Sequence, residues 1–155
     1  MKFLTDITLG KLTKWLRILG YDTRWHHGCL APSHLRMAEQ EGRLVLTRNR
    51  ALKPEKDPAG LLVILQDKVE GQLEEVLIKL NLRYEPKQAF SRCLKCNVPL
   101  SPVAREEVAG LVPEYVLENY DDFRRCPECR GIFWPGTHRG KMQSFLKTHN
   151  RLDHP

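Results

Sequence analysis

The sequence predicts an α/β fold in which helices cover both faces of a mainly parallel sheet, followed by a small cysteine-containing module. Up to residue 82, short apolar runs alternate with segments whose apolar residues recur at helical spacing. This alternation is typical of parallel strands joined by right-handed helical crossovers. Beyond residue 90, two C-x2-C pairs replace it. A chain of 155 residues has room for one main core and a small added module.

The first half of the sheet is predicted from three segments. Residues 2–5 form a strand. A helix is expected after it because the leucines and Trp15 recur every three or four residues, and Gly20 ends that helix. Residues 21–25 read as the second strand. The next helix is expected to begin at Ser33, whose hydroxyl can cap it, and to end before Gly42.

The second half of the sheet repeats the pattern. Residues 44–47 are apolar and form the third strand, and residues 61–65 form a fourth strand covered on both faces. A helix follows, with apolar residues at helical spacing: Leu73, Val76, Leu77 and Leu80. The connector from residue 83 to 91 then separates the sheet from the cysteine pairs.

Positive charge is concentrated at the start of the chain. The formal net charge is +6, and the first 53 residues hold ten lysines and arginines against four acids. A local basic excess favours a polyanionic partner, nucleic acid before others, although a solubilising surface has the same composition. On the first helix, Lys11, Lys14 and Arg17 recur every three residues, which predicts one exposed cationic face.

The cysteines indicate a metal site. No apolar run reaches the ~20 residues of a membrane span, and no signal peptide opens the chain, so we expect a cytoplasmic protein without a membrane segment. In a reducing compartment, paired cysteines indicate metal rather than disulfides. A structural zinc site in a zinc ribbon with an inserted segment is therefore predicted at Cys93, Cys96, Cys126 and Cys129. The lone Cys29 is expected to have no such role.

Ligands of open α/β sheets bind beyond the carboxyl ends of the strands. That rule selects Asp6 after the first strand, the His26-His27 pair after the second, Thr47 with the turn Arg48-Asn49-Arg50 after the third, and Asp67 after the fourth. Metal-dependent phosphodiester cleavage would require several carboxylates to converge there. For Asp6, capping of the following helix is an equally suitable role.

Four stretches in order, FLTDITLGKLTKWLRILGYDT, EQEGRLVLTRNRAL, RCLKCNVPL and CPECRGIFWPGTH, resemble the Mut-7 C-terminal RNase domain family. The resemblance implies a PIN-like three-layer sandwich over residues 1–85 and a zinc-ribbon module with a helical insert and basic tail over residues 86–155. It further implies ribonuclease activity with Mg²⁺ or Mn²⁺ held by acids. In the matching stretches, Asp6 and Glu41 correspond to family acids, and Lys11 and Arg17 to its basic helix.

The chain departs from the family at two acids. An aspartate is usual at the start of the second helix, where this chain has LAPSH, and another follows LTR, where it has Asn49. An amide brings no charge, and the flanking Arg48 and Arg50 oppose a cation and attract a phosphate. We therefore predict an RNA-binding protein of PIN-like ribonuclease fold with an incomplete metal site, in which Asp6, Asp67 and Glu41 support any residual cleavage.

Two alternatives remain open, and with them whether the chain is an enzyme. One is an active Mg²⁺- or Mn²⁺-dependent ribonuclease. The other is a non-catalytic module that docks on a protein or on a large ribonucleoprotein such as the ribosome. For the latter, Phe133 and Trp134 beside the second cysteine pair would supply a surface, unless they pack the core of the ribbon.

Overall fold

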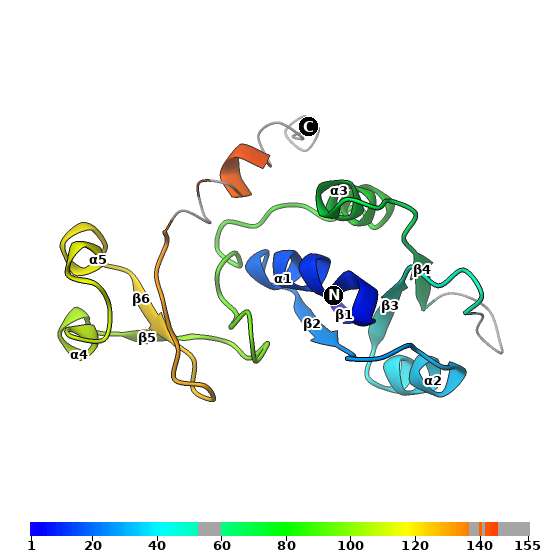
Figure 1. Cartoon of the computed structure of the whole chain (residues 1–155), viewed down its shortest axis with the longest axis horizontal. Coiled ribbons are helices and arrows are strands. Elements are labelled where there is room, and N and C mark those ends of the chain that lie inside the picture. Colours follow the sequence, from blue (N-terminus) through cyan, green and yellow to red (C-terminus); the bar gives the residue numbers. More distant parts are fainter. Residues whose placement is uncertain (53–59, 137–139, 141, 146–155) are drawn as a thin grey trace.

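The computed structural model describes residues 1–52, 60–136, 140 and 142–145. Its first half is built on a parallel sheet of four strands in the order β2-β1-β3-β4 (Figure 1). The strands are β1 (Lys2–Thr5), β2 (Asp22–Trp25), β3 (Arg43–Thr47) and β4 (Leu61–Val63). The predicted parallel α/β sheet is confirmed. Within the described ranges, no helix is both long enough and apolar enough to cross a membrane.

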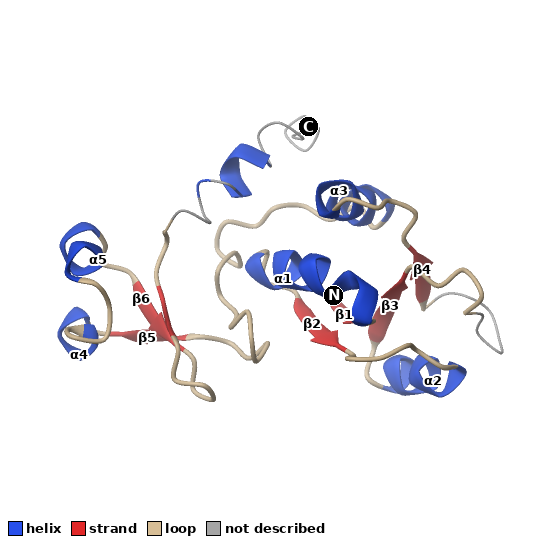
Figure 2. Ribbon diagram, viewed as in Figure 1, coloured by secondary structure: helices blue, strands red, loops and turns tan. Residues whose placement is uncertain are grey.

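Helices cover both faces of this sheet (Figure 2). A 3-10 turn η1 (Ile7–Leu9), helix α1 (Gly10–Ile18) and helix α3 (Val69–Lys79) share one core with Phe3 and Leu46. Helix α2 (Pro32–Gln40) packs with Leu4 and Val45 on the other face. Successive strand residues point to opposite faces, so β1 and β3 each contribute side chains to the cores on both faces of the sheet. The result is the predicted three-layer sandwich.

Helix α2 begins at Pro32, one residue before Ser33, and the prediction that Ser33 caps it is wrong. Ala31 occupies the capping position, and Pro32 is the first helical residue. Proline suits that place because its φ is already helical and it has no N–H to satisfy. The Nδ1 atom of His34 accepts a hydrogen bond from the Ala31 amide at 2.9 Å, so a side chain of the first turn satisfies the N–H of the capping residue.

The cysteine module has its own antiparallel sheet. Its strands are β5 (Ser101–Val103), β6 (Phe123–Arg125) and β7 (Ile132–Phe133), in the order β5-β6-β7. Between β5 and β6 lie two short helices, α4 (Arg105–Val108) and α5 (Glu114–Asn119), so the helical insert is confirmed. The fully buried core is small and consists of Val108, Val116 and Phe123. The predicted basic tail falls in residues 146–155, outside the described ranges.

The two halves are joined by direct contacts. The amide of Phe90 donates to the carbonyl of Ile18 at 2.7 Å, and the Nε atom of Arg92 donates to the carbonyl of Gly20 at 3.0 Å. Gly20 has a φ of +92°, and a Cβ there would lie 2.3 Å from the carbonyl oxygen of Gln88. Only glycine permits this approach. Further along the chain, Met142 is fully buried in the core beneath α1, so packing crosses the boundary predicted at residue 85.

Candidate functional site

An open hollow lies at the carboxyl edge of the parallel sheet, where η1 and α1 begin on one side and α3 begins on the other. Its polar lining comprises Thr8, Lys11, Arg48, Asp67, Lys68, Glu70 and Gln72. Three of these side chains are cations and two are acids. The hollow therefore lies where the strand-end rule placed the site.

Asp6 follows β1 directly and is almost fully buried, with 4% of its surface exposed. Its Oδ1 atom accepts hydrogen bonds from the amide of Thr8 at 2.9 Å and from the hydroxyl of Thr8 at 2.5 Å. Its Oδ2 atom accepts one from the hydroxyl of Thr47 at 2.5 Å. Both carboxylate oxygens thus have protein donors, and Asp6 caps η1 while tying the end of β1 to the end of β3.

Asn49 lies on the turn after β3 and its amide serves that turn. The side-chain Oδ1 atom accepts a hydrogen bond from the amide of Ala51 at 2.9 Å. Its own backbone amide donates to the hydroxyl of Thr47 at 3.0 Å. This is the local Asx geometry that asparagine favours in turns. The oxygen that an aspartate would offer to a cation is therefore directed at the backbone.

Asp67 and Arg48 form an ion pair across the hollow. Asp67 is 84% exposed and Arg48 is 37% exposed, so water screens the pair and it adds little stability. The pair nevertheless neutralises the charge of Asp67, the acid that follows β4. Lys11 and Lys68 are exposed on the rim of the hollow, whereas exposed Arg50 and Lys14 lie outside its lining.

Glu41 lies at the other end of the sheet from Asp6, because it precedes β3 and Asp6 follows β1. It pairs with Arg43 at 2.6 Å and with Arg24 at 2.7 Å, and the hydrogen bond from Arg43 lowers the pKa of its carboxyl. Arg43 also pairs with Asp22 at 2.7 Å. Glu41 thus belongs to an ion-pair network at the amino edge and does not join the acids of the hollow.

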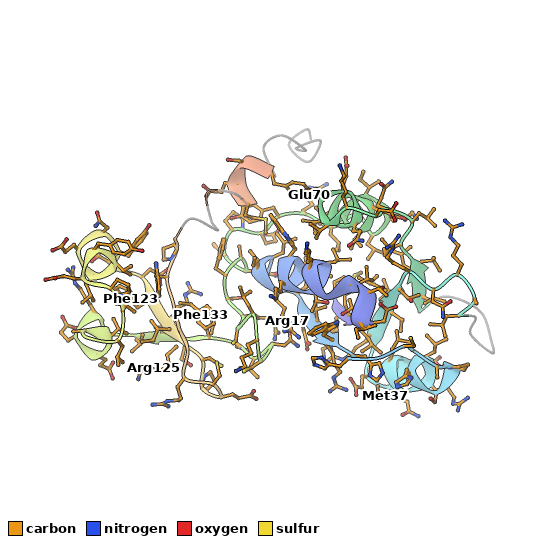
Figure 3. The ribbon with its side chains drawn as sticks, viewed as in Figure 1. Arg17, Met37, Glu70, Phe123, Arg125 and Phe133 are labelled. Atoms are coloured by element: carbon orange, nitrogen blue, oxygen red, sulfur yellow. The ribbon has the colours of Figure 1, made fainter. Side chains whose placement is uncertain are left out.

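Arg17 is buried, with 7% of its surface exposed, whereas Lys11 and Lys14 are exposed. The expectation of one exposed cationic face is therefore wrong for Arg17. Its guanidinium donates to the carbonyls of Thr23 at 2.9 Å, Leu94 at 2.7 Å and Lys95 at 3.2 Å. Figure 3 labels Arg17 beside the loop that carries the first cysteine pair. The cysteine module covers this part of α1, and Arg17 holds the two together.

The four predicted cysteines come together. Their sulfur atoms all lie within 4.8 Å of one another, and those of Cys93 and Cys129 are 3.8 Å apart. Four sulfurs around one ion at the ~2.3 Å zinc–sulfur distance would be separated by about 3.8 Å, so the donor set fits a tetrahedral metal ion. Within the described part of the chain, no other group of three or more metal-ligating side chains was found.

The two cysteine pairs are held by matching turns. The amide of Cys93 donates to the carbonyl of Val98, and the amide of Asn97 donates back to the carbonyl of Cys93, both at 2.9 Å. The second pair has the same two bonds. The amide of Cys126 donates to the carbonyl of Gly131 at 2.9 Å, and the amide of Arg130 donates to the carbonyl of Cys126 at 3.0 Å. Asn97 and Arg130, each directly after the second cysteine, have φ values of 66° and 63°. The backbone thus presets two equivalent metal-binding turns.

The four thiols lie close enough to shift the pKa values of one another. Burial, aided by hydrogen bonds from neighbouring thiols, raises the pKa of the Cys96 thiol to about 12. A backbone hydrogen bond from Gly131 lowers the pKa of the Cys129 thiol to about 7. Burial also raises the pKa of Cys93. A cation bound at this site would displace the remaining protons and favour four thiolates.

Sequence reasoning missed several residues of the hollow. Thr8 holds the carboxylate of Asp6, and Lys68 and Glu70 line the hollow from the start of α3. The strand-end rule could have found Lys68, which directly follows Asp67. The capping role considered for Asp6 could have found Thr8, two residues later. Thr47 was selected by the strand-end rule, but nothing in the local pattern marks it as a partner of Asp6, because the two residues lie at the ends of different strands.

Comparison with known proteins identifies the family. A family model described as the Mut7-C RNAse domain matches residues 1–146. No curated protein and no solved structure matches the chain. Since the matched region includes the parallel sheet, the hollow and both cysteine pairs, the chain belongs to the Mut7-C RNAse domain family.

Proposed function

We propose that this protein binds RNA through the hollow at the carboxyl edge of its parallel sheet, without a divalent cation at that edge. The observation that carries the proposal is the hollow's lining, in which Lys11, Arg48 and Lys68 outnumber Asp67 and Glu70. Membership of an RNase domain family makes RNA the expected polyanion. Lysine and arginine on a concave surface supply the phosphate contacts that dominate affinity for nucleic acids.

The electrostatics of the hollow favour an anion. Asp67 is already paired with Arg48, which leaves Lys11 and Lys68 facing Glu70. The hollow also faces the first turn of α3, a helix of 11 residues. The free backbone amides of a helix start are suited to phosphate oxygens. The positive charge of the two lysines and of the helix N-terminus together exceeds the negative charge of Glu70, the one acid of the lining that is not paired with Arg48.

The same edge is poorly equipped for a metal ion. Both oxygens of Asp6 accept hydrogen bonds from Thr8 and Thr47, and the Asn49 oxygen is used by its own turn. Mg²⁺ and Mn²⁺ need several oxygen ligands, with carboxylates to supply charge. We infer that the PIN-like metal site is incomplete and that RNA is held here by cations of the protein.

Lys11→Gln tests this proposal by measuring affinity for fluorescently labelled single-stranded RNA over a series of salt concentrations. Loss of one phosphate contact is expected to reduce the slope of log affinity against log salt by about 0.7, and to weaken binding to unrelated RNA sequences equally. Mild EDTA that leaves the cysteine-bound metal in place should not change the affinity of the unmodified protein.

The matched control is Lys2→Gln, which removes an exposed lysine at the amino end of β1, away from the hollow. It should leave the salt slope unchanged. Equal slopes for the two variants would place the phosphate contacts elsewhere. An affinity that collapses in mild EDTA would instead show that a divalent cation holds the RNA.

Active metal-dependent cleavage is the second candidate, because the carboxylates of Asp67 and Glu70 line the same hollow as Thr8, the partner of Asp6. Asn49→Asp distinguishes the two functions. One oxygen of the new carboxylate can keep the bond from the Ala51 amide, while the other adds charge beside Asp6. We expect Mn²⁺-dependent RNA cleavage to rise roughly tenfold over the unmodified protein.

The control for that gain is Asp6→Ala in the Asn49→Asp background, which should abolish it. Strong Mn²⁺-dependent cleavage by the unmodified protein, with no gain from Asn49→Asp, would show that the natural site is already complete. Cleavage products would be resolved on denaturing gels after metal is added to protein from which loosely bound cations have been removed.

The remaining assignments follow from the cysteine site and the family. We infer that the ion of the four cysteines is zinc in a structural role, because four thiolates leave no position for a reacting water. Reduced paired cysteines suit the cytoplasm. We also propose the division into a PIN-like domain at residues 1–85 and a zinc-ribbon module at residues 86–155, and we propose RNA of a ribonucleoprotein such as the ribosome as the partner.

A further inference from the structure

A cavity of about 120 Å³ lies where the end of α1 meets the cysteine module. It is separate from the hollow at the carboxyl edge and from the four cysteines. Its walls come from Ile18 at the end of α1, from the connector between the two halves, and from β6, β7 and the residues beside these strands. In Figure 3, Phe133, which lines the cavity, is labelled in the cysteine module beside β6.

Three aromatic side chains line this cavity: Phe90, Phe133 and Trp134. Trp134 also packs against the small core of the cysteine module. Packing of the ribbon core is thus confirmed for Trp134, while a binding surface at Phe133 and Trp134 stays a prediction. Aromatic walls of this kind suit a flat, apolar guest.

The charged side chains of the cavity are Arg92, which is bonded to backbone carbonyls, and the pair of Arg124 and Asp122. Arg92 lines it but is committed to the structure, since it donates to the carbonyls of Gly20 at 3.0 Å and of Asn97 at 2.7 Å. Arg124 and Asp122 are only loosely paired, at 3.4 Å, and remain 33% and 55% exposed. The cavity thus offers one donor group and one acceptor group to a guest, beside its aromatic walls.

We propose that this cavity holds one unpaired base of a single-stranded RNA whose backbone lies on the hollow, an inference that rests on the proposed function. Unpaired bases are recognised by stacking on aromatic rings and by hydrogen bonds to their edges. Arg124 can donate to a base carbonyl, and Asp122 can accept from an exocyclic amine. A cavity of this size has room for one ring system and is well below the volume of cofactor sites.

Helix α1 connects the cavity to the hollow. Residues 11, 14 and 18 follow a three- and four-residue spacing and so lie along one stripe of the helix. Lys11 lines the hollow, Ile18 lines the cavity, and Lys14 is exposed between them. Seven residues of helix span about 10 Å, which is roughly three nucleotides of a stacked strand at ~3.4 Å each. A single strand can therefore reach both places while Lys14 faces its backbone.

A cavity-filling substitution provides the test. Ala89 lines the cavity and is buried, with 6% exposed, so Ala89→Leu places a side chain where the base would stack, without changing charge. Affinity for single-stranded RNA should fall about tenfold, the lower range of one lost stacking contact. The salt slope should stay the same because no phosphate contact is removed. Affinity for duplex RNA, which has no free base to insert, should not change.

A second pair of variants keeps the test valid if Ala89→Leu fails to fold. Arg124→Gln removes the donor of the cavity, and Arg105→Gln is its matched control. Each of these arginines lies in the cysteine module and pairs with an aspartate, at 3.4 Å and 3.2 Å, but Arg105 does not line the cavity. Arg124→Gln should reduce affinity for single-stranded RNA several-fold more than Arg105→Gln does.

The outcomes separate the two proposals. If the unmodified protein binds no RNA even at low salt, the proposed function fails and the base-binding cavity fails with it. If the unmodified protein binds single-stranded RNA and both cavity variants bind it equally well, only the cavity assignment is overturned, and the cavity is then left for an apolar side chain of a protein partner. An equal loss on single-stranded and duplex RNA would also overturn it.

Discussion

Replacing Arg17 by methionine is expected to lower the free energy of unfolding by about 3 kcal/mol. The guanidinium of Arg17 bridges α1 to β2 through Thr23 and to the first cysteine pair through Leu94 and Lys95. Methionine fills a similar volume but leaves these three carbonyls without their donor. A buried polar group without a partner costs more than the net value of the bond it has lost.

The electrostatic setting adds to this cost. Burial lowers the pKa of Arg17, and the nearby Cys93, Cys96 and Asp22 act in the opposite direction. Arginine nevertheless stays charged at neutral pH. When the four cysteines bind a divalent ion as thiolates, the site carries net negative charge, and Arg17 is the buried cation beside it. Methionine would remove that compensation as well.

Thermal unfolding measures the effect. A loss of about 3 kcal/mol corresponds to a drop of roughly 6–12 °C in Tm for a chain of this size. The control is Lys14→Met, one turn earlier on α1 and exposed, which should change Tm little. Arg17→Lys should fall between the two, because an ammonium lacks the planar fork that reaches several carbonyls. Equal Tm values for Arg17→Met and Lys14→Met would contradict the bridging role.

Removing the metal is expected to unfold the cysteine module. Among the described residues, the buried apolar cluster of this module consists of Val108, Val116 and Phe123, and a core of that size does not stabilise an independent fold. Structural zinc supplies about 10–16 kcal/mol of apparent binding free energy in small four-ligand modules. Without it, the two turns at Cys93 and Cys126 have no common anchor.

Cys126→Ser and a strong chelator should therefore have the same effect. We expect elemental analysis of the unmodified protein to find one equivalent of zinc. Both treatments should abolish it, and both should erase the NMR signals of β5, β6 and β7. Signals of the parallel sheet should persist with shifts near Arg17. The control is Cys29→Ser, because Cys29 is exposed and outside the cluster. Retention of dispersed β6 signals in metal-free protein would refute the role of the metal in folding.

Much of the fold could be predicted from local pattern. The strand over residues 2–5 is found as predicted, and β2, β3 and β4 begin or end within two residues of the predicted strands. Alternation of strand and helix fixes a parallel sheet because a right-handed crossover is the only common connection. The cluster of four cysteines could be predicted from spacing alone, since two C-x2-C pairs are typical of a single four-cysteine metal site.

The candidate site was predicted less completely, because it depends on side chains from different elements. Glu41 and Asp6 are both acids next to strand ends, but they lie at opposite ends of neighbouring parallel strands. Asn49 was predicted to face a metal or a phosphate, and its oxygen instead closes a turn with Ala51. Competition of this kind between local backbone bonds and a distant ligand leaves no trace in residue spacing.

By itself, the sequence determined the alternation of strands and helices, the two metal-binding turns, and the basic character of the first third of the chain. Tertiary structure alone decided that Arg17 is buried while Lys11 and Lys14 stay exposed. Helical periodicity reports which side of α1 faces its own sheet. It carries no information about a second module that packs on the polar side, more than seventy residues later along the chain.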